Sequence, residues 1–473
     1  KLTRKRRKSR MHNGSGNGHG GMESQIAISS DLIGRHRMTG SIFRISVLVT
    51  GVLFLLGIVG FVIKVINNGT SDPSEWGYYA ALVSFLLTAG SGAVMVAIAT
   101  RLVKAHWRRS ISRASEIFTI VVLYTFILFI PLLFILPGLS DGRRSIWFFG
   151  NLKNVPELIP HIMTAISFAS LALVGVALLW MSSRPDLASL RDVSSGHDGF
   201  FGRIANTWYG TSRQWFTQDH RIGILGALYF MTLVTTHFLF SMDFSMSLVP
   251  GWIDALFPAT HAHNSLHAGV AVVLLTMFVL RRCGGYDEYI GFDQFWGLGK
   301  LLFALSLLWF WFWFSSFIIF WYGAKPSEQG VLELLMVGPY LPIFMAAFIL
   351  NFVVPLFTMI WNPLRRSIWG PTVIAASVLA GTFFDRIRLF VASWSVTSVE
   401  NKHALHDVPG LVMPDVYDIL MWIGGVAGAI LVYLLVTRVV PVVSIWEQKE
   451  LLLYKIHKPF HRLEEVLVLG KKD

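Results

Sequence analysis

The feature that most constrains this chain is a series of ten apolar stretches, each long enough to cross a bilayer as a helix. The hydrocarbon interior offers no hydrogen-bond partner to the backbone, so segments of this length must pair their own amide groups, as α-helices do. The sequence therefore predicts an all-α, polytopic membrane protein with ten transmembrane helices, arranged as two four-helix bundles plus two further helices. The predicted helices are residues 43–66, 77–103, 116–138, 159–181, 222–247, 264–280, 299–323, 337–361, 370–393 and 415–440.

The 40 Lys and Arg residues are divided unevenly between the two predicted sides of the membrane. Of these, 32 lie in or next to the two tails and the loops that share their side, whereas 5 lie in the opposite loops. Lys and Arg accumulate in cytoplasmic segments, so we expect both termini to be cytoplasmic. The net charge of +12 is then a signal of topology and of contact with anionic lipid headgroups, not of nucleic-acid binding.

The predicted domain organisation has three parts. Residues 1–42 are expected to form a flexible basic cytoplasmic tail, residues 43–440 the ten-helix membrane domain, and residues 441–473 a cytoplasmic C-terminal tail folded as an amphipathic helix. The aromatic side chains around residues 208–216 predict a short interfacial helix. Only 14% of the residues are charged, against about a quarter in soluble domains, which excludes a soluble enzyme.

Cysteine content restricts the redox chemistry that this chain can hold by itself. Cys283 is the single cysteine, so an internal disulfide, a covalently attached c-type haem and a cysteine-held iron–sulfur cluster are excluded. Any redox centre that works with this protein must have other ligands or belong to a partner.

Ionisable residues inside a membrane are costly, so they are functional candidates. With the termini inside, His161, His237 and Asp243 fall toward the outer side of the predicted fourth and fifth helices. Imidazole titrates near pH ~6.5, and burial raises the pKa of a carboxyl group, so both can exchange protons near neutrality. We predict that these three are the catalytic residues. Further candidates follow along the chain on the same side: Trp252, Asp254, His261, His263 and His267.

These histidines also allow other interpretations. His237 could be a hydrogen-bonded packing residue between helices. His261 and His263 could begin a metal site, although two ligands do not complete one. A b-type haem could use two of His161, His237 and His267. Asp243 has the poorest packing explanation, because it stands between Met242 and Phe244 in a spanning helix.

A second group of charges lies within the predicted ninth helix. Asp385 and Arg386 are adjacent, and Arg388 follows two residues later. Neighbouring residues point in different directions on a helix, so we expect each to find partners on other helices. A proton relay and a structural cross-link both remain open for Asp385 and Arg386, as they do for Asp254 and His267.

Several segments resemble the NrfD/polysulfide-reductase membrane-subunit family, and most resemble the large quinol-binding membrane subunit of alternative complex III. The resemblance extends over nearly the whole chain and includes Asp385-Arg386, where that subunit usually has Glu-Arg. Its motifs are HWRRSISRASEIFT at 106–119, RPDLASLRD at 184–192, DFSMSLVPGWIDALFP at 243–258 and VTRVVPVVSIWEQKE at 436–450. The resemblance implies that the chain itself holds no metal or haem and works on a membrane quinone, menaquinone or ubiquinone.

The same resemblance implies the partners: an extracytoplasmic iron–sulfur subunit, a multihaem cytochrome, other membrane subunits and lipids, in a bacterial inner membrane. It places Trp252 and Phe134 with Asp243 and His161 at the quinone. Four positions depart from the family pattern: Ser91, Phe134 and Ile253 replace histidines, and His161 replaces an aspartate. Quinone chemistry is therefore either rebuilt around His161, His237 and Asp243, or lost.

The leading prediction is an integral membrane subunit of a quinol oxidoreductase complex, not active alone. It would bind quinol near the outer face, accept its protons and pass its electrons to the iron–sulfur partner. The alternative is a quinone-free anchor or proton-conducting subunit of such a complex. A secondary transporter fits less well, because symmetric helix breaks are not visible.

Overall fold

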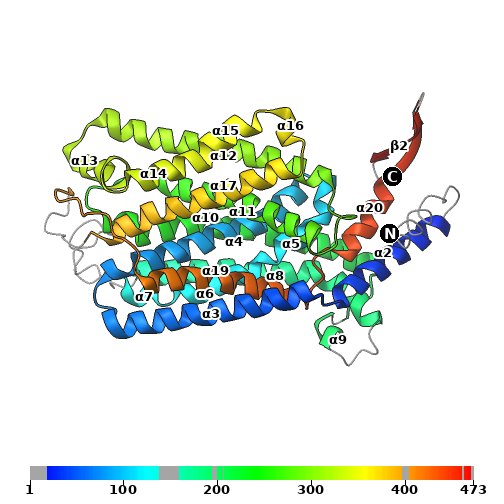
Figure 1. Ribbon diagram of the computed structural model, residues 1–473. Helices are drawn as coiled ribbons and strands as arrows, with labels where there is room; N and C mark the ends of the chain where they lie inside the picture. The colour runs from blue at the N-terminus through cyan, green and yellow to red at the C-terminus, as the bar shows by residue number, and fades with distance from the viewer. Residues whose placement is uncertain are drawn as a thin grey trace.

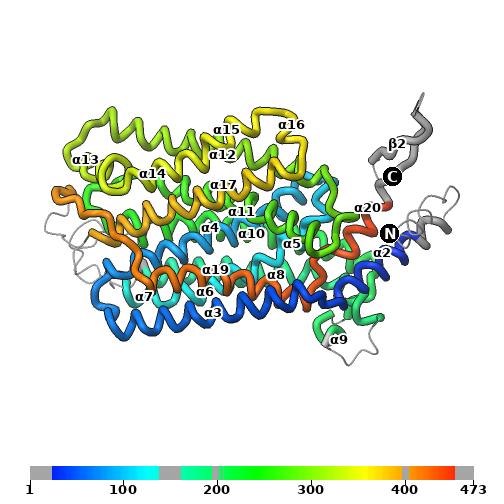
Figure 2. The backbone as a smooth tube through the Cα atoms, viewed as in Figure 1, coloured from blue at the N-terminus to red at the C-terminus, as the bar shows by residue number. Residues whose placement is uncertain are grey.

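The protein is described by a computed structural model over residues 19–137, 159–193, 200–205, 207–396, 404–460 and 463–469. Long helices run side by side along one axis, and both termini lie at the same end of the bundle (Figure 1). We call this end the terminal end and the opposite one, where α13 lies, the distal end. The tube view shows the same lengthwise packing without side chains (Figure 2).

Helices dominate the described part of the chain. Their bounds are α2 His19–Arg37, α3 Ser41–Asn68, η1 Pro73–Trp76, α4 Gly77–Leu102, η2 His106–Ser110, α5 Ser112–Glu116, α6 Phe118–Phe129, α7 Leu132–Ile135, α8 Ile159–Val193, α9 Phe200–Ala205, α10 Ser212–Phe244, η3 Met246–Leu248, α11 Phe257–Arg282, α12 Phe292–Gly323, α13 Pro326–Leu332, η4 Glu333–Val337, α14 Leu341–Phe348, η5 Ile349–Val353, α15 Val354–Met359, α16 Asn362–Arg365, α17 Trp369–Arg386, η6 Ile387–Val391, α18 Ala392–Trp394, α19 Val416–Val436 and α20 Ile445–Tyr454.

Nine helices in the described ranges are long and apolar enough to cross a membrane, against ten predicted. The predicted ninth span, residues 370–393, is not one of the nine. It forms α17, η6 and α18 and still runs lengthwise beside α14 (Figure 1). Asp385 and Arg386 at the end of α17 make this segment less apolar than the others. The membrane-embedded part is all-helical as predicted, and the exact count of ten is not established.

Helix α4 lies at the centre of the bundle, and most of its apolar residues are buried. It approaches α11 unusually closely, because a Cβ on Gly92 would lie only 1.6 Å from the carbonyl oxygen of Ser265. Gly269 on α11 packs in turn on the backbone of Gly92. Small residues allow membrane helices to approach in this way. This contact brings the polar side chains of α4 within reach of the histidines on α10 and α11.

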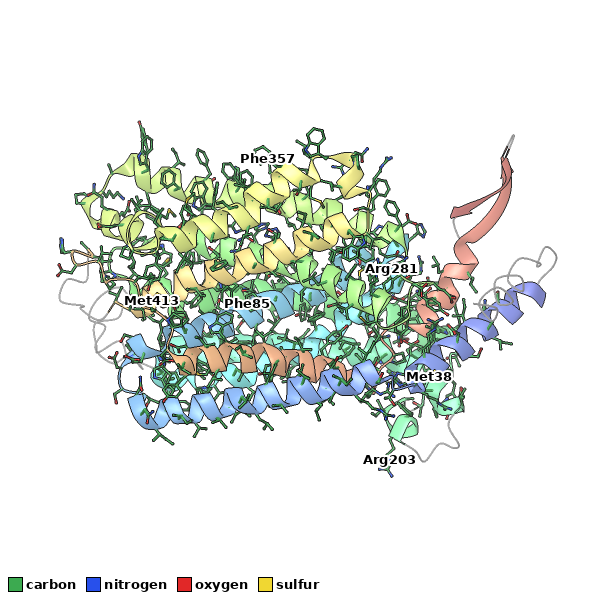
Figure 3. The ribbon with its side chains drawn as sticks, viewed as in Figure 1. Met38, Phe85, Arg203, Arg281, Phe357 and Met413 are labelled. Carbon is green, nitrogen blue, oxygen red and sulfur yellow. The ribbon has the colours of Figure 1, made fainter. Side chains whose placement is uncertain are left out.

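The outside of the bundle is apolar, as lipid contact requires. Most of α3 is exposed, and Phe357 of α15 lies on the outer surface (Figure 3). The apolar surface is continuous with the long exposed faces of the other helices. These faces, together with the buried centre, indicate an integral membrane protein.

Three predictions about the segments outside the membrane domain need correction. The tail predicted to be flexible is helical over His19–Arg37, and the part before residue 19 lies outside the described residues. The C-terminal segment is helical only over α20. It then forms an antiparallel pair of strands, β1 Lys455–Phe460 and β2 Leu463–Leu469, and Pro459 cannot continue a helix.

The third correction concerns the predicted interfacial helix at residues 208–216. Trp208 precedes α10, whereas Trp215 lies in its first turn. Helix α10 begins between these two residues because Thr211 forms a capping box with Gln214. The Thr211 hydroxyl accepts from the Gln214 backbone amide, and the Gln214 side chain accepts from the Thr211 backbone amide. The two indole rings nevertheless pack edge to face, 5.1 Å apart.

Candidate functional site

A pocket opens toward the distal end between α11, α12, η4 and η6. Its cavity volume, taken as the space open to the centre of a water-sized sphere, is about 50 Å³. Its walls are mainly aromatic, from Trp252, Phe257, Trp309, Phe312 and Trp313. Ligand pockets for small molecules are commonly lined by apolar side chains, with a few polar groups that orient the ligand. We call this space the distal pocket. Its polar lining residues are Asp254, Thr260, His261, Asn264, Ser316, Asp385, Arg386 and Arg388.

The base of the distal pocket holds a buried cluster of charges centred on Asp385. Its carboxylate accepts from Arg386 Nη2 and Arg388 Nη2, each at 2.6 Å, and from Asn264 Nδ2 at 3.3 Å. Arg388 also donates to the Leu335 carbonyl. One carboxylate stands against two guanidiniums, so the cluster carries a net positive charge. We call it the Asp385 cluster.

Asp385 and Arg386 pair directly with each other, and the expected partner on another helix is found for Asp385, in Asn264 of α11. The regular turn of α17 changes at this point into the π-helix η6, Ile387–Val391. A π-helical turn is wider than an α-turn and is frequent at functional sites. Three charged side chains from one short segment can therefore converge on the same pocket. Asn264 of α11 supplies the contact from another helix.

Several buried polar atoms at the distal pocket have no hydrogen-bond partner within the described residues. They are Arg386 Nε and Nη1, Asn264 Oδ1 and Trp313 Nε1. Leaving such groups unpaired costs free energy, so they favour a ligand that pairs with them. Donors are provided by Arg386 and Trp313, and an acceptor by Asn264. The pocket can thus bind a flat ligand with both oxygen acceptors and hydroxyl groups.

Asp254 lies at the mouth of the distal pocket and is partly exposed. One oxygen accepts from the backbone amides of Leu256 and Phe257, at 2.8 and 3.2 Å, just before and at the start of α11. The other accepts from the hydroxyl of Ser316 on α12. The indole of Trp252 packs on Phe257 beside it, with ring centroids 4.5 Å apart. Asp254 is therefore held firmly and also connects the pocket with the exterior.

Behind the pocket, His261 contacts His237 across the α10–α11 interface. Their Nδ1 atoms are 2.8 Å apart, and both rings are fully buried. His237 Nε2 lies 2.9 Å from Ser91 Oγ, and His261 Nε2 lies 3.1 Å from Ser84 Oγ, both on α4. His261 lines the pocket, whereas His237 does not line it and contacts it only through His261.

The other predicted catalytic residues lie apart from the distal pocket. Asp243 on α10 accepts a hydrogen bond from Thr164 on α8 at 3.2 Å. His161 is buried one turn before Thr164 on the same helix. Neither lines the distal pocket, and Phe134 is 81% exposed on α7. The structure therefore brings Trp252, Asp254, Asp385 and Arg386 together, and leaves His161, Asp243 and Phe134 outside.

The remaining histidines face different neighbours. His263 contacts the Leu305 carbonyl at 3.0 Å and His267 the Ser306 hydroxyl at 2.8 Å, both on α12. His261 faces α10 and α4 instead, so His261 and His263 do not converge as metal ligands. Among the described residues, no three His, Cys, Asp or Glu side chains are grouped to hold a metal ion.

Asn264 is the site residue that the sequence interpretation did not single out. It lies three residues after His261 and three before His267, in the polar first half of α11. Spacings of three and four place residues on one helical face. This pattern of polar residues could have identified Asn264 as part of the same face.

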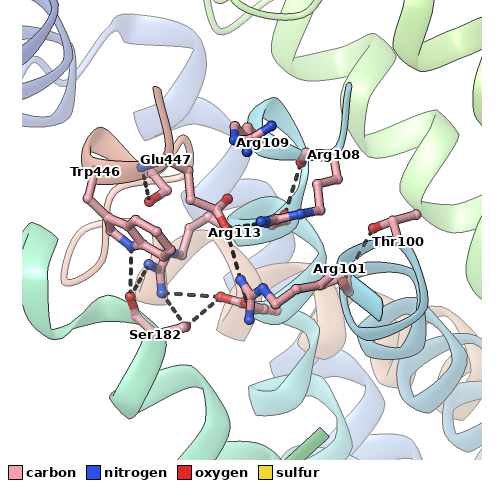
Figure 4. A network of polar contacts seen from close by, with 12 residues as sticks. Thr100, Arg101, Arg108, Arg109, Arg113, Ser182, Trp446 and Glu447 are labelled. Atoms are coloured by element: carbon pink, nitrogen blue, oxygen red, sulfur yellow. Dashed lines mark hydrogen bonds and ion pairs between the residues drawn. The ribbon is translucent and has the colours of Figure 1, made fainter. Parts of the chain in front are cut away.

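A second buried polar network closes the terminal end of the bundle (Figure 4). Glu447 of α20 accepts from Arg101 at 2.9 Å and Arg108 at 2.6 Å. Arg113 donates to Asp186 at 3.0 Å and to Ser182 at 2.7 Å. These contacts attach α20 to α4 and η2, and α5 to α8. We call them the terminal network.

The long apolar helices and the polar pocket among them define an integral membrane protein with an intramembrane polar site. The sequence matches the family Polysulphide reductase, NrfD over residues 66–399, and the chain belongs to this family. The family consists of membrane subunits of polysulfide-reductase-like oxidoreductase complexes, which generally interact with quinones and associate with iron–sulfur subunits. No curated protein sequence matches the chain significantly.

Proposed function

We propose that this chain is the quinone-interacting membrane subunit of a quinol oxidoreductase complex, and that the quinone ring occupies the distal pocket. The observation that carries the proposal is the convergence of Arg386, Asn264 and Trp313 on an aromatic pocket, with polar atoms that have no partner in the described residues. A quinone presents a flat ring, which aromatic walls accommodate, and two opposed oxygens, which these groups can bind.

The residues divide into two roles. Arg386, held by Asp385, orients one ring oxygen and stabilises negative charge that develops on it. Asp254 at the mouth exchanges the hydrogen bond that it accepts from Ser316 for one from the other quinol hydroxyl. It then accepts the proton of that hydroxyl and releases it on the distal side. Asp385 itself is a poor base, because it already accepts from two guanidiniums and an amide. Oxidation of one quinol releases two protons and two electrons: Asp254 takes the protons one after the other, releasing the first on the distal side before it accepts the second, and the electrons leave to the iron–sulfur partner.

The distal end would face outward from a bacterial inner membrane. The terminal end carries most of the Lys and Arg residues, including Arg101, Arg108 and Arg281, and this distribution of positive charge supports a cytoplasmic terminal end. The resemblance to alternative complex III implies that a multihaem cytochrome and other membrane subunits would complete the assembly. This orientation puts the mouth of the distal pocket on the side of an extracytoplasmic partner.

The test is quinol oxidation by the purified complex with Asn264→Leu. This variant removes the side-chain amide that lines the pocket but keeps a side chain of similar size. We expect quinol-dependent electron transfer to fall at least about tenfold while the complex still assembles. Asn351→Leu is the matched control, since Asn351 is equally buried but packs on Gly381 away from the pocket. Wild-type turnover in Asn264→Leu would contradict the distal-pocket proposal and would assign quinol oxidation to another part of the complex.

A further inference from the structure

At the terminal end, three exposed cationic side chains lie against two indole rings. Lys300 Nζ is 3.9 Å from the ring centroid of Trp296, and the Arg366 guanidinium lies 5.6 Å from the same ring. Arg282 lies 5.2 Å from the ring of Trp369. These five residues come from α11, α12 and the turn between α16 and α17. We call them the cation–indole patch.

The backbone under the patch is held tightly. In the α16–α17 turn, a Cβ on Gly370 would lie 2.0 Å from the Leu364 carbonyl oxygen, so only glycine fits there. The Gly370 amide donates to Ser367 Oγ at 2.8 Å. Gly299 of α12 packs on Pro371 at the start of α17, where a Cβ would lie 3.0 Å from Pro371 Cγ. The positions of Arg366 and Trp369 relative to α12 are therefore fixed by packing.

The charges of the patch are not balanced within the protein. In the described part of the chain, Arg282, Lys300 and Arg366 have no carboxylate within salt-bridge distance. The nearby terminal network differs, since its arginines pair with Glu116, Asp186, Glu447 and Glu450. The patch is thus a cluster of three positive charges with room for an anion.

The patch also lies at the level where helices leave the apolar region. α11 ends at Arg282 and α12 begins at Phe292, and indole rings are typical of the membrane–water interface. One turn further into the bundle, Val279 on α11 and Val373 on α17 are exposed and apolar. A cationic group above an apolar surface matches a phosphate headgroup above acyl chains.

We propose that the cation–indole patch binds the headgroup of an anionic phospholipid. Its phosphate would lie among Arg282, Lys300 and Arg366, with the acyl chains along the exposed faces of α11 and α17. Basic pockets between membrane helices on the cytoplasmic side bind such headgroups. The site is at the opposite end from the distal pocket and goes beyond the function proposed above.

Native mass spectrometry of the intact complex tests the proposal, with phosphatidylglycerol and phosphatidylcholine added after detergent exchange. We expect the wild type to retain phosphatidylglycerol more strongly than phosphatidylcholine. In the variant R282Q/K300Q/R366Q, phosphatidylglycerol binding should weaken at least about tenfold. The control variant K104Q/R213Q/R221Q neutralises three other exposed cations of the terminal end and should bind as the wild type does.

Three outcomes would overturn the proposal. Equal retention of both lipids by the wild type would do so without any variant, so the test does not depend on folding of the triple mutant. Unchanged phosphatidylglycerol binding in R282Q/K300Q/R366Q would place the lipid elsewhere. Displacement of the bound lipid by millimolar inorganic phosphate would assign the patch to a free anion.

Discussion

His237 and His261 face each other through their Nδ1 atoms at 2.8 Å, and the surrounding contacts fix which ring carries which proton. Ser91 donates its hydroxyl hydrogen to the Leu87 carbonyl at 2.6 Å, so it must accept from His237 Nε2. His237 Nδ1 is then an acceptor, and His261 Nδ1 must donate to it. His261 Nε2 in turn accepts from Ser84. Both rings are neutral in this arrangement, and every contact is satisfied.

This pairing predicts an asymmetry between single and double substitutions. His237→Phe should reduce the free energy of unfolding by about 1–3 kcal/mol, because a buried nitrogen of His261 loses its partner. His237→Phe/His261→Phe should cost less than the sum of the two single variants, since both polar groups are removed. Denaturant titration in detergent would measure this coupling. Strictly additive losses would show that the two rings do not interact.

The Asp385 cluster should be far more sensitive than an exposed ion pair. Asp385→Asn leaves the two buried guanidiniums without their carboxylate, and removal of one partner from a buried pair costs about 3–5 kcal/mol. Lys325→Ala is the control, because Lys325 is largely exposed and its contact with Glu328 is worth about 0–1 kcal/mol. The yield and thermal midpoint of the assembled complex report the difference. Similar midpoints for the two variants would contradict this account of the cluster.

Attachment of α20 should depend on pH through Glu447. Burial by itself raises the pKa of Glu447, but Arg108 and Arg101 lower it by more, so its pKa lies below the usual range. A group with a lowered pKa stabilises the fold above its unfolded pKa, near 4.5, and loses this contribution as the pH falls through the lower folded value. We expect α20 to remain attached from pH 7 to about 5 and to detach in stronger acid.

Limited proteolysis within α20 would follow this detachment. Glu447→Gln should expose α20 to the protease already at pH 7, because Arg101 and Arg108 lose a charged partner. Trp446, whose indole donates to the Ser182 carbonyl at 3.1 Å, provides a fluorescence signal for the same event. Protection of α20 in Glu447→Gln at pH 7 would contradict the role of this carboxylate.

The helix α2 should respond to pH in a milder range. Burial, together with Arg438 and Arg37, lowers the pKa of His36 to about 4. When α2 is released, the imidazole of His36 takes up a proton below its ordinary pKa of 6.5. Docking of α2 should therefore weaken as the pH falls from 6.5 toward 4. Hydrogen exchange of α2 measures this, and His36→Phe should abolish the dependence. An unchanged pH dependence in that variant would assign it to another group.

Much of the membrane architecture could be predicted from the sequence, because apolar length alone forces helices in lipid. The limits of this reasoning are visible at residues 455–460 and 463–469, which form strands, and at α2, which is helical where a flexible tail was expected. Both segments lie outside the long apolar helices. The two strands pair with each other, and hydropathy gives no guide to such pairing.

The site was predicted only in part, for a different reason. The sequence interpretation singled out Asp385, Arg386, Asp254 and Trp252, and the structure places all four at one pocket. It also grouped His161 with Asp243 as the catalytic centre, but depth along a helix does not say which side of the helix faces a cavity. The π-turn after Arg386 and the close contact of Gly92 with α11 decide that arrangement, and neither has a signal in hydropathy.

Photoaffinity labelling of the intact, membrane-embedded complex is the most direct test of the central proposal. A photoreactive quinone analogue is activated by light, and the labelled peptides are identified by mass spectrometry, with native quinone as competitor. The account predicts competable labelling of α11, α12 or the α17–η6 segment around Asn264, Trp313 and Arg386. Labelling confined to α8 and α10, around His161 and Asp243, would contradict it.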